Sequence, residues 1–238
     1  MKATDQEIAR LTRRSFLTGG IAAAAGFGGW MWIRNGLHEG GIPKPLRRAE
    51  QADDLFSHAL FSESRLARTF DAADIGEARA NGDIGLGDDP EPDWRLEIEG
   101  GSPVTLDQIK ALPKLEEITQ FKCIEGWNYI MKWGGAKFSD FAAAHASGMT
   151  QKSWVGLETP DGDYYVGLDR ASAMHPQTLL AYEMNGQPLT SEHGAPLRLL
   201  IPVKYGIKNL KRIGKITFTD VRPRDYWAEN GYDYDSGF

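Results

Sequence analysis

The one cysteine of this chain, Cys123, stands in the segment Phe-Lys-Cys-Ile-Glu-Gly-Trp at residues 121–127. A thiolate is a soft ligand, and binding to a metal centre deprotonates the thiol outright. Lys122 beside it favours the anion. The same residue types also suit a structural cysteine, because free cysteine is among the residues most often buried. With one cysteine, neither an intramolecular disulfide nor a thiolate-cluster zinc site can form.

A second group of candidate residues is basic. Arg198 falls in the apolar run 197–203, where an unpaired charge would be costly. A dense basic cluster follows it, made of Lys204, Lys208, Lys211, Arg212 and Lys215. This cluster is either a solvated basic face or a site for a small anionic ligand. The whole chain has 33 acidic and 27 basic residues, so it lacks the positive field of a nucleic-acid binder.

Strands and one capped helix are predicted around these residues. The stretch 118–123 places Thr119, Phe121 and Cys123 on one side of a strand. Thr105 and Gln108 have the spacing of a capping box at the start of a helix. Alternation and a Pro-Asp-Gly-Asp hairpin signal predict further strands at 94–98, 154–159, 164–168, 197–203 and 216–219, and helical patterns cover 49–61 and 141–146. The predicted fold class is α+β, with mostly antiparallel or irregular strands.

The N-terminus carries an export signal. Thr-Arg-Arg-Ser-Phe-Leu-Thr at residues 12–18 places paired arginines before an uncharged stretch, 15–33, which is the pattern of a twin-arginine leader. The alternative is an ordinary N-terminal helix with a chance arginine pair. Ala23 to Ala25 offer a cleavage site, whereas residues 30–33 extend the apolar stretch toward the length of about 20 residues that spans a bilayer. Cleavage and a retained anchor both stay open.

These patterns predict that the chain has three parts. We expect a twin-arginine signal or membrane anchor at residues 1–34, an extended segment that wraps the domain at 35–92, and one strand-rich domain at 93–238. The length of 238 residues suits one sizeable domain with an extension, since a domain commonly takes about 100–200 residues.

Three segments together resemble the sulfite-oxidase superfamily of molybdopterin-dependent oxidoreductases. They are Cys-Ile-Glu-Gly-Trp (123–127) with Lys-Trp-Gly-Gly (132–135), Ala-Met-His-Pro-Gln-Thr-Leu-Leu-Ala-Tyr-Glu-Met-Asn-Gly (173–186), and His-Gly-Ala-Pro-Leu-Arg-Leu (193–199) running into Ile-Pro-Val-Lys-Tyr-Gly-Ile-Lys-Asn-Leu-Lys (201–211). The chain is most similar to the bacterial exported branch, which includes the catalytic subunit of the periplasmic methionine-sulfoxide reductase.

This resemblance implies the sulfite-oxidase fold, Mo-molybdopterin as the cofactor, and a role for each matching residue. Cys123 would ligate molybdenum through sulfur, and Glu125 falls where this branch keeps a carboxylate near the metal. The positions that hold the pterin and its phosphate are Thr159, His193, Arg198, Lys208, Asn209, Leu210 and Lys211. The physical chemistry agrees, because a buried phosphate needs charge-assisted donors and arginine offers a bidentate fork.

Two departures from the family narrow the prediction. The branch carries an asparagine near the pterin in its N-terminal portion, and Asn81 is the best candidate, although a plain Asn-Gly turn explains it equally well. Sulfite oxidases of the eukaryotic type keep an arginine shortly after the cysteine, and Trp-Asn-Tyr stands here at 127–129. Sulfite is therefore the less expected substrate, although Lys132 could supply charge. His175, in a His-Pro pair, fits a structural role better than acid–base catalysis.

The predicted function is oxygen-atom transfer that reduces sulfoxides such as methionine sulfoxide, free or in proteins. The alternatives are oxidation of sulfite or another small molecule at the same cofactor, and a cofactor-free exported binding domain. The chain has no Cys-x-x-Cys-His haem motif, so a separate haem-containing partner, possibly bound to the membrane, is expected to carry electrons. The acidic tail 225–235 either docks this partner or packs and solvates the domain. We expect a periplasmic location.

Overall fold

The computed structural model describes residues 5–39, 42–60, 65–80, 82–87 and 93–237. The chain divides into two compact units, Met1–Ala52 and Asp53–Phe238. Each unit is described by itself.

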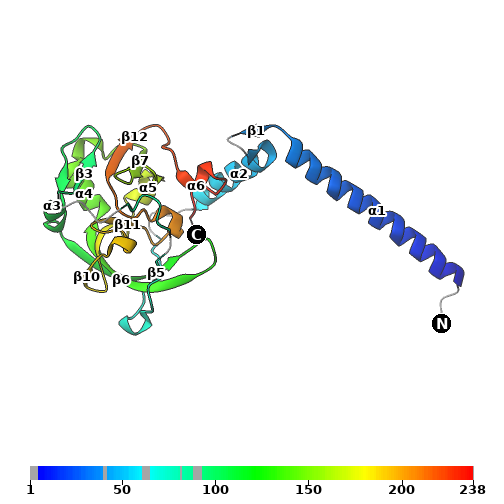
Figure 1. Cartoon of the computed structure of the whole chain (residues 1–238), viewed down its shortest axis with the longest axis horizontal. Helices are drawn as coiled ribbons and strands as arrows, with labels where there is room; N and C mark the ends of the chain where they lie inside the picture. The colour runs from blue at the N-terminus through cyan, green and yellow to red at the C-terminus, as the bar shows by residue number, and fades with distance from the viewer. Residues whose placement is uncertain (1–4, 40–41, 61–64, 81, 88–92, 238) are drawn as a thin grey trace. The chain divides into compact units, whose positions relative to one another are not determined.

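The first unit is dominated by one long helix, α1 (Asp5–Asn35), drawn in blue in Figure 1. Its segment Arg13–Asn35 is long and apolar enough to cross a membrane, and none of that apolar stretch is buried within the protein. Phe16, Ile21 and Trp32 are each more than half exposed. Two short antiparallel strands of two residues each follow, β1 (His38–Glu39) and β2 (Ile42–Pro43). The helix α2 (Lys44–Leu60) begins directly after them.

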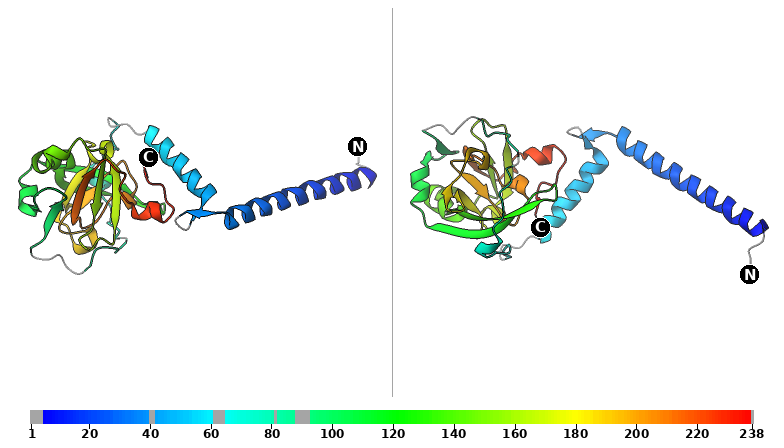
Figure 2. Two further views of the ribbon diagram at one scale, coloured as in Figure 1. Left: turned by 90° about the horizontal axis from the view of Figure 1, so that it is seen from above. Right: turned by 60° about the horizontal axis from the view of Figure 1, so that its bottom comes forward.

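The described strands of the second unit form two five-stranded sheets. The first has the order β10-β9-β6-β5, with β11 also paired to β9, and all its pairs are antiparallel. Its strands are β5 (Lys114–Lys122), β6 (Asn128–Lys137), β9 (Leu179–Met184), β10 (Gln187–Pro188) and β11 (Arg198–Leu200). Figure 2 shows β5 and β6, in green, as a long ribbon that curves along one side of the unit.

The second sheet has the order β4-β3-β12-β7-β8, in which only the β3–β12 pair is parallel among the described strands. Its strands are β3 (Arg95–Ile98), β4 (Val104–Thr105), β7 (Trp154–Glu158), β8 (Tyr165–Asp169) and β12 (Lys215–Thr219). The short helices of the unit are α3 (Leu106–Lys110), α4 (Phe138–His145), α5 (Arg170–Ala173) and α6 (Tyr226–Glu229), with 3-10 turns at Ala72–Asp74, Ser147–Met149, Ser191–His193 and Gly206–Lys208.

The inner strands of the first sheet, β6 and β9, are buried on both faces, because their neighbouring residues belong to different cores. Leu180 on β9 packs into the large core that the second sheet and α4 share, whereas Leu179 packs into a smaller core with Met131 and Trp133 of β6. Phe121 and Trp127 pack against this smaller core. The hairpin that carries Cys123 therefore rests on the smaller core.

Most of the elements predicted from the sequence are confirmed. The capping box of Thr105 and Gln108 is present at the start of α3, and the hairpin predicted around residues 160–163 is formed by β7 and β8. The predicted strand at 118–123 is the second half of β5, which ends at Lys122. The α+β class is confirmed. Within the segment 35–92, expected to be extended, α2 is helical, and Thr69 forms an isolated bridge with Thr119 of β5.

Candidate functional site

The turn of the β5–β6 hairpin positions Cys123. Lys122 faces Asn128 in the register, so Cys123 is the first residue of the connecting loop. Its N–H donates to the Trp127 carbonyl (2.9 Å), and the Gly126 N–H donates back to the Cys123 carbonyl (3.1 Å). Gly126 has a φ of +89°, in the left-handed region where a glycine carries no Cβ penalty. The loop is thus fixed by backbone bonds, and Cys123 is 9% exposed.

The carboxylate of Glu125 lies beside the thiol. Its Oε2 atom is 3.8 Å from the Cys123 Sγ and accepts a hydrogen bond from the Trp127 indole N–H at 2.8 Å. Burial raises the pKa of the Cys123 thiol, and the charge of Glu125 raises it further. A thiolate at this position therefore needs a cation or a metal centre to stabilise it. The arrangement suits a metal ligand with a carboxylate close by.

Stacked aromatic rings line the approach to Cys123. Phe121 and Tyr129 stack with their centroids 4.9 Å apart, and Trp127 stacks on both at 6.0 Å. The guanidinium of Arg79 lies over the Trp127 ring, 4.7 Å from its centroid. These contacts give the approach apolar walls with one cation on them.

Cys123 opens into a cavity that encloses about 690 Å³, including its mouth. The cavity is lined by Arg79, Gly82, Ile84, Phe121, Cys123, Trp127, Tyr129, Tyr164, Arg198, Gly206, Ile207, Asn209, Lys211 and Trp227. Four of the residues predicted from the sequence, Cys123, Arg198, Asn209 and Lys211, are therefore brought together, although they come from widely separated parts of the chain.

Arg198 is a buried cation whose hydrogen bonds in the described structure go to carbonyl groups. It is 1% exposed; Nη1 donates to the His193 carbonyl (3.0 Å) and Nη2 to the Asn209 carbonyl (3.3 Å). Its Nε has no hydrogen-bond partner among the described residues. The guanidinium carbon is 4.9 Å from the centroid of Trp133. A buried charge is normally paired, so this group is ready for an anion.

Two neighbours of Arg198 complete a site for an anionic ligand. The Nδ1 of His193 is buried and has no hydrogen-bond partner among the described residues, and burial together with the charge of Arg198 lowers the pKa of His193. The ring is therefore neutral near pH 7 and can donate from one nitrogen. Lys211 donates to the Gly82 carbonyl at 2.9 Å, and burial lowers its pKa to about 8. Asn209 bonds the backbone of Ile201 (2.8 Å), which fixes the loop.

The remaining predicted residues lie elsewhere. The Lys208 ammonium is in a buried ion pair with Asp225 and also donates to the Gly167 carbonyl at 3.0 Å. Thr159 lines a second cavity, where Gly85 packs directly against it, and Leu210 is part of the large core. Asn81 lies outside the described residues. His175 is buried, and its ring nitrogens contact the Arg65 carbonyl and the Gln177 N–H, in keeping with a structural role.

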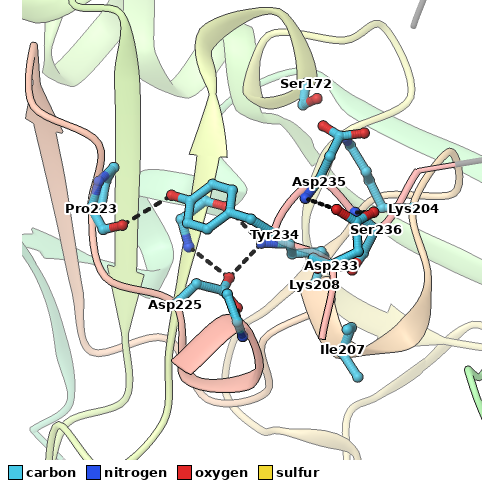
Figure 3. Close-up of polar contacts among 12 residues, drawn as sticks. Ser172, Lys204, Ile207, Lys208, Pro223, Asp225, Asp233, Tyr234, Asp235 and Ser236 are labelled. Carbon is cyan, nitrogen blue, oxygen red and sulfur yellow. Dashed lines mark hydrogen bonds and ion pairs between the residues drawn. The ribbon is translucent and has the colours of Figure 1, made fainter. Parts of the chain in front are cut away.

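The basic cluster does not act as one unit. Lys204 and Lys208 form buried ion pairs with Asp235 and Asp225, and Lys215 bonds Glu99 and Glu158 at the surface. The acidic tail thus supplies the counter-ions of Lys204 and Lys208, as Figure 3 shows, and these two aspartates pack inside the domain. Of the alternatives for the tail, the structure supports packing for Asp225 and Asp235.

Among the lining residues that sequence reasoning did not single out as site residues are Arg79, Tyr164, Ile207 and Trp227. Arg79 stands two positions before Asn81, and Trp227 stands in the acidic tail, so neither belongs to a motif near Cys123. The hydroxyl of Tyr164 donates to the Ile207 carbonyl (2.6 Å), and burial raises the Tyr164 pKa. Lys132, considered as a source of charge, is paired with Glu116 at 2.9 Å and does not line the cavity.

The family model for the oxidoreductase molybdopterin binding domain matches residues 83–227. The chain belongs to this family. It is 38% identical over 148 residues to a candidate protein-methionine-sulfoxide reductase subunit, YedZ1, of Azospira oryzae, covering 60% of this chain and 56% of that protein. It is 35% identical over 153 residues to the protein-methionine-sulfoxide reductase catalytic subunit MsrP of Campylobacter jejuni, covering 56% and 52%. The chain thus spans about half the length of the curated relatives it matches.

The solved structures agree on the fold. The sulfane dehydrogenase SoxCD of Paracoccus pantotrophus aligns with a TM-score of 0.50 and 20% identity, over 60% of this chain and 41% of that one. This likeness supports the predicted sulfite-oxidase fold and carries no further conclusion.

The residues of the cavity fit a molybdopterin. The cofactor brings a phosphate, and the cavity is lined by the buried Arg198, whose Nε lacks a hydrogen-bond partner among the described residues. The buried His193 does not line this cavity, but its carbonyl accepts from Arg198 and its Nδ1 has no hydrogen-bond partner among the described residues. The cofactor also brings a metal, and the thiol of Cys123 lines the same cavity. Soft thiolate ligands and charge-assisted phosphate donors are the two requirements of such a group.

Proposed function

We propose that this chain reduces sulfoxides, such as methionine sulfoxide, with molybdenum-molybdopterin held in the Cys123 cavity. The observation that carries the proposal is that one cavity is lined by both the Cys123 thiol, with the Glu125 carboxylate beside it, and the Arg198 guanidinium, whose Nε has no hydrogen-bond partner among the described residues. Support also comes from the relatives, whose names describe reductases of protein-bound methionine sulfoxide. The net reaction takes one sulfoxide, two protons and two electrons to one thioether and one water.

Each residue has a task in this proposal. Cys123 ligates molybdenum through Sγ, and Arg198, His193 and Lys211 hold the pterin phosphate. Bound molybdenum-molybdopterin supplies oxygen-atom transfer with a two-electron change, and this chemistry belongs to the cofactor. The protein contributes position, access and electrostatics.

Glu125 is placed to hold a proton near the reacting oxygen. Its Oε2 is fixed by the Trp127 indole N–H, so the carboxylate cannot rotate freely away from the Cys123 Sγ. The water product needs two protons, and a carboxyl group within reach of the metal ligand can relay them. The stacked rings of Phe121, Trp127 and Tyr129 limit access of bulk water on their side.

The remaining parts of the proposal concern location and partners. The paired arginines before the apolar part of α1 favour export to the periplasm by the twin-arginine route, and the length of Arg13–Asn35 is sufficient for an anchor in the inner membrane. Electrons come from a separate haem-containing partner, which can itself be a membrane protein. Thr159 and Lys208 keep their proposed part in cofactor binding, with Thr159 lining the second cavity and the Lys208 ammonium paired with Asp225.

Sulfite oxidation is the second candidate, and one observation favours it. Arg79 and Lys211 line the cavity, so cations are present even though no arginine directly follows the cysteine. A small oxyanion would meet positive charge there. The substrate assay below separates the two candidates.

The test uses the full chain loaded with molybdenum and pterin. We expect reduction of methionine sulfoxide with an artificial electron donor and little oxidation of sulfite with an artificial acceptor. Cys123→Ser should lose molybdenum and activity together. Lys132→Gln is the matched control from the same hairpin, and it should keep both because its ammonium is paired with Glu116. Unchanged turnover in Cys123→Ser would count decisively against ligation, and faster turnover of sulfite than of sulfoxide would favour the second candidate.

A further inference from the structure

Trp227 is the lining residue farthest along the chain from Cys123. It belongs to α6, a single turn in the C-terminal tail, and it is half-buried against the cavity. Its ring makes edge contacts with Tyr226 and Tyr232, with centroids 5.3 and 5.1 Å away. Tyr164, which lines the same cavity, donates its hydroxyl to the Ile207 carbonyl. The Trp227 indole thus packs against the rings of Tyr226 and Tyr232.

A buried ion pair fixes the start of this turn. Asp225 is 2% exposed, and its Oδ2 accepts from the Lys208 ammonium and from the Gly167 N–H (3.1 Å). Its Oδ1 accepts from the Ala228 N–H (3.1 Å) and so caps α6. One side chain therefore joins β8, the Lys208 turn and α6, and Trp227 is the next residue but one.

A second buried pair fixes the far side of the turn. Lys204 pairs with Asp235, and the Tyr205 N–H donates to the Ser236 carbonyl at 2.9 Å. Between the two pairs the Tyr234 hydroxyl donates to the Pro223 carbonyl at 3.1 Å, and its ring lies 4.2 Å from the Lys208 ammonium. Figure 3 shows these groups meeting around Tyr234. Because both ends are clamped, residues 226–234 cannot move away from the cavity without breaking a buried pair.

We propose that Trp227 is a specificity-determining residue, held by these two ion pairs as a rigid wall that limits the size of the group on the sulfoxide sulfur. The inference rests on the proposed sulfoxide reduction and deepens it. The apolar rings of the cavity suit the organic substituents of a sulfoxide, and the cation Arg79 on the Trp127 ring suits its oxygen. If Trp227 keeps a fixed position, the cavity should accept S-methyl sulfoxides and bind a sulfoxide with a bulky second substituent less well. One extra methylene in a hydrophobic pocket commonly changes kcat/KM about 10-fold or more.

The test compares dimethyl sulfoxide with methyl p-tolyl sulfoxide on the full, metal-loaded chain. In Trp227→Ala we expect kcat/KM for the bulky substrate, divided by that for the small one, to rise about tenfold. The change should lie mainly in KM, and Trp227→Phe should fall between the two. Asp225→Asn, which removes the charge of the clamp, should move the ratio in the same direction. Glu229→Gln on the same helical turn is the matched control, and its ratio should equal that of the wild type, because Glu229 bonds Arg224 and Tyr165 at the surface.

Molybdenum analysis and pterin fluorescence accompany each assay, because they report cofactor retention separately from activity. Loss of pterin from both Trp227→Ala and Trp227→Phe would show that the indole holds the cofactor, and would overturn the inference. An unchanged ratio of the two kcat/KM values in loaded Trp227→Ala would also overturn the inference. In that case, turnover of both sulfoxides by the wild type would still support the proposed function. If the loaded wild type reduced neither sulfoxide but did reduce methionine sulfoxide, this inference alone would fail; if it reduced none of the three, the proposed function would fail and this inference with it.

Discussion

Removal of the Asp225 carboxylate should destabilise the protein strongly, because three groups depend on it. In Asp225→Ala the Lys208 ammonium, 1% exposed, keeps only the Gly167 carbonyl, and stranding such a charge costs about 3–5 kcal/mol. The lost cap of α6 costs about 1 kcal/mol. The Gly167 N–H, left without an acceptor, costs about 1–3 kcal/mol. These effects overlap, so we expect a total of about 4–6 kcal/mol.

The double variant Lys208→Met with Asp225→Ala isolates the charge. It removes both ions, so what remains is the lost cap and the unpaired N–H, about 2 kcal/mol. Lys208→Met alone strands the carboxylate and should also cost about 3–5 kcal/mol. The double variant is therefore expected to be more stable than either single one, with a coupling energy of about 3 kcal/mol or more.

Equilibrium unfolding of the full chain in urea, followed by tryptophan fluorescence, measures these free energies. The wild type and the three variants complete a double-mutant cycle. A cost below about 1 kcal/mol for Asp225→Ala would refute the reasoning, because exposed ion pairs have that value. So would a double variant no more stable than Asp225→Ala alone, since the pair would then contribute nothing as a pair.

Three further predictions follow from the cavity and the clamp. The Arg198→Met variant should purify without pterin but should not be less stable as a cofactor-free chain, because the buried cation has no carboxylate partner in the described structure. Pterin fluorescence measures cofactor retention and urea unfolding measures stability. Retained pterin would contradict the prediction. Burial lowers the pKa of Lys211 to about 8, so its charged form reduces folding stability below pH 8, and this cost disappears as the pH rises toward 10.5. Because Lys211 loses its charge above about pH 8, anion binding should weaken there, and pyrophosphate should raise the Tm less at pH 9 than at pH 7. The Lys211→Gln variant should lack this difference between the two pH values. Gly167→Ala would place a Cβ 1.8 Å from the Tyr234 hydroxyl, so it should displace the tail and cost about 1–3 kcal/mol in urea unfolding, whereas an unchanged midpoint would show that the tail is not packed there.

The sequence predicted much of the local structure. Alternation, a capping box and a hairpin signal are properties of short segments, so β5, β7, β8, β12 and the start of α3 could be predicted from neighbouring residues. The interpretation of Arg198 as a buried cation also came from its local context, because a charge in an apolar strand must face the interior. Cys123 remains the expected metal ligand, a prediction that the structure supports by placing it in the same cavity as Arg198.

The partners of each charge could not be predicted from the sequence. Lys204, Lys208 and Lys211 stand within eight positions of one another, and spacing alone gave them one common role. The folded chain separates them, because Asp225 and Asp235 arrive from the C-terminal tail to neutralise two of the three and leave Lys211 at the cavity. The same tail brings Trp227 to within the cavity wall, more than 100 positions after Cys123. The sequence by itself determined which residues could bind a metal and an anion; only the tertiary structure decided which charges are already paired, because pairing depends on contacts between distant segments.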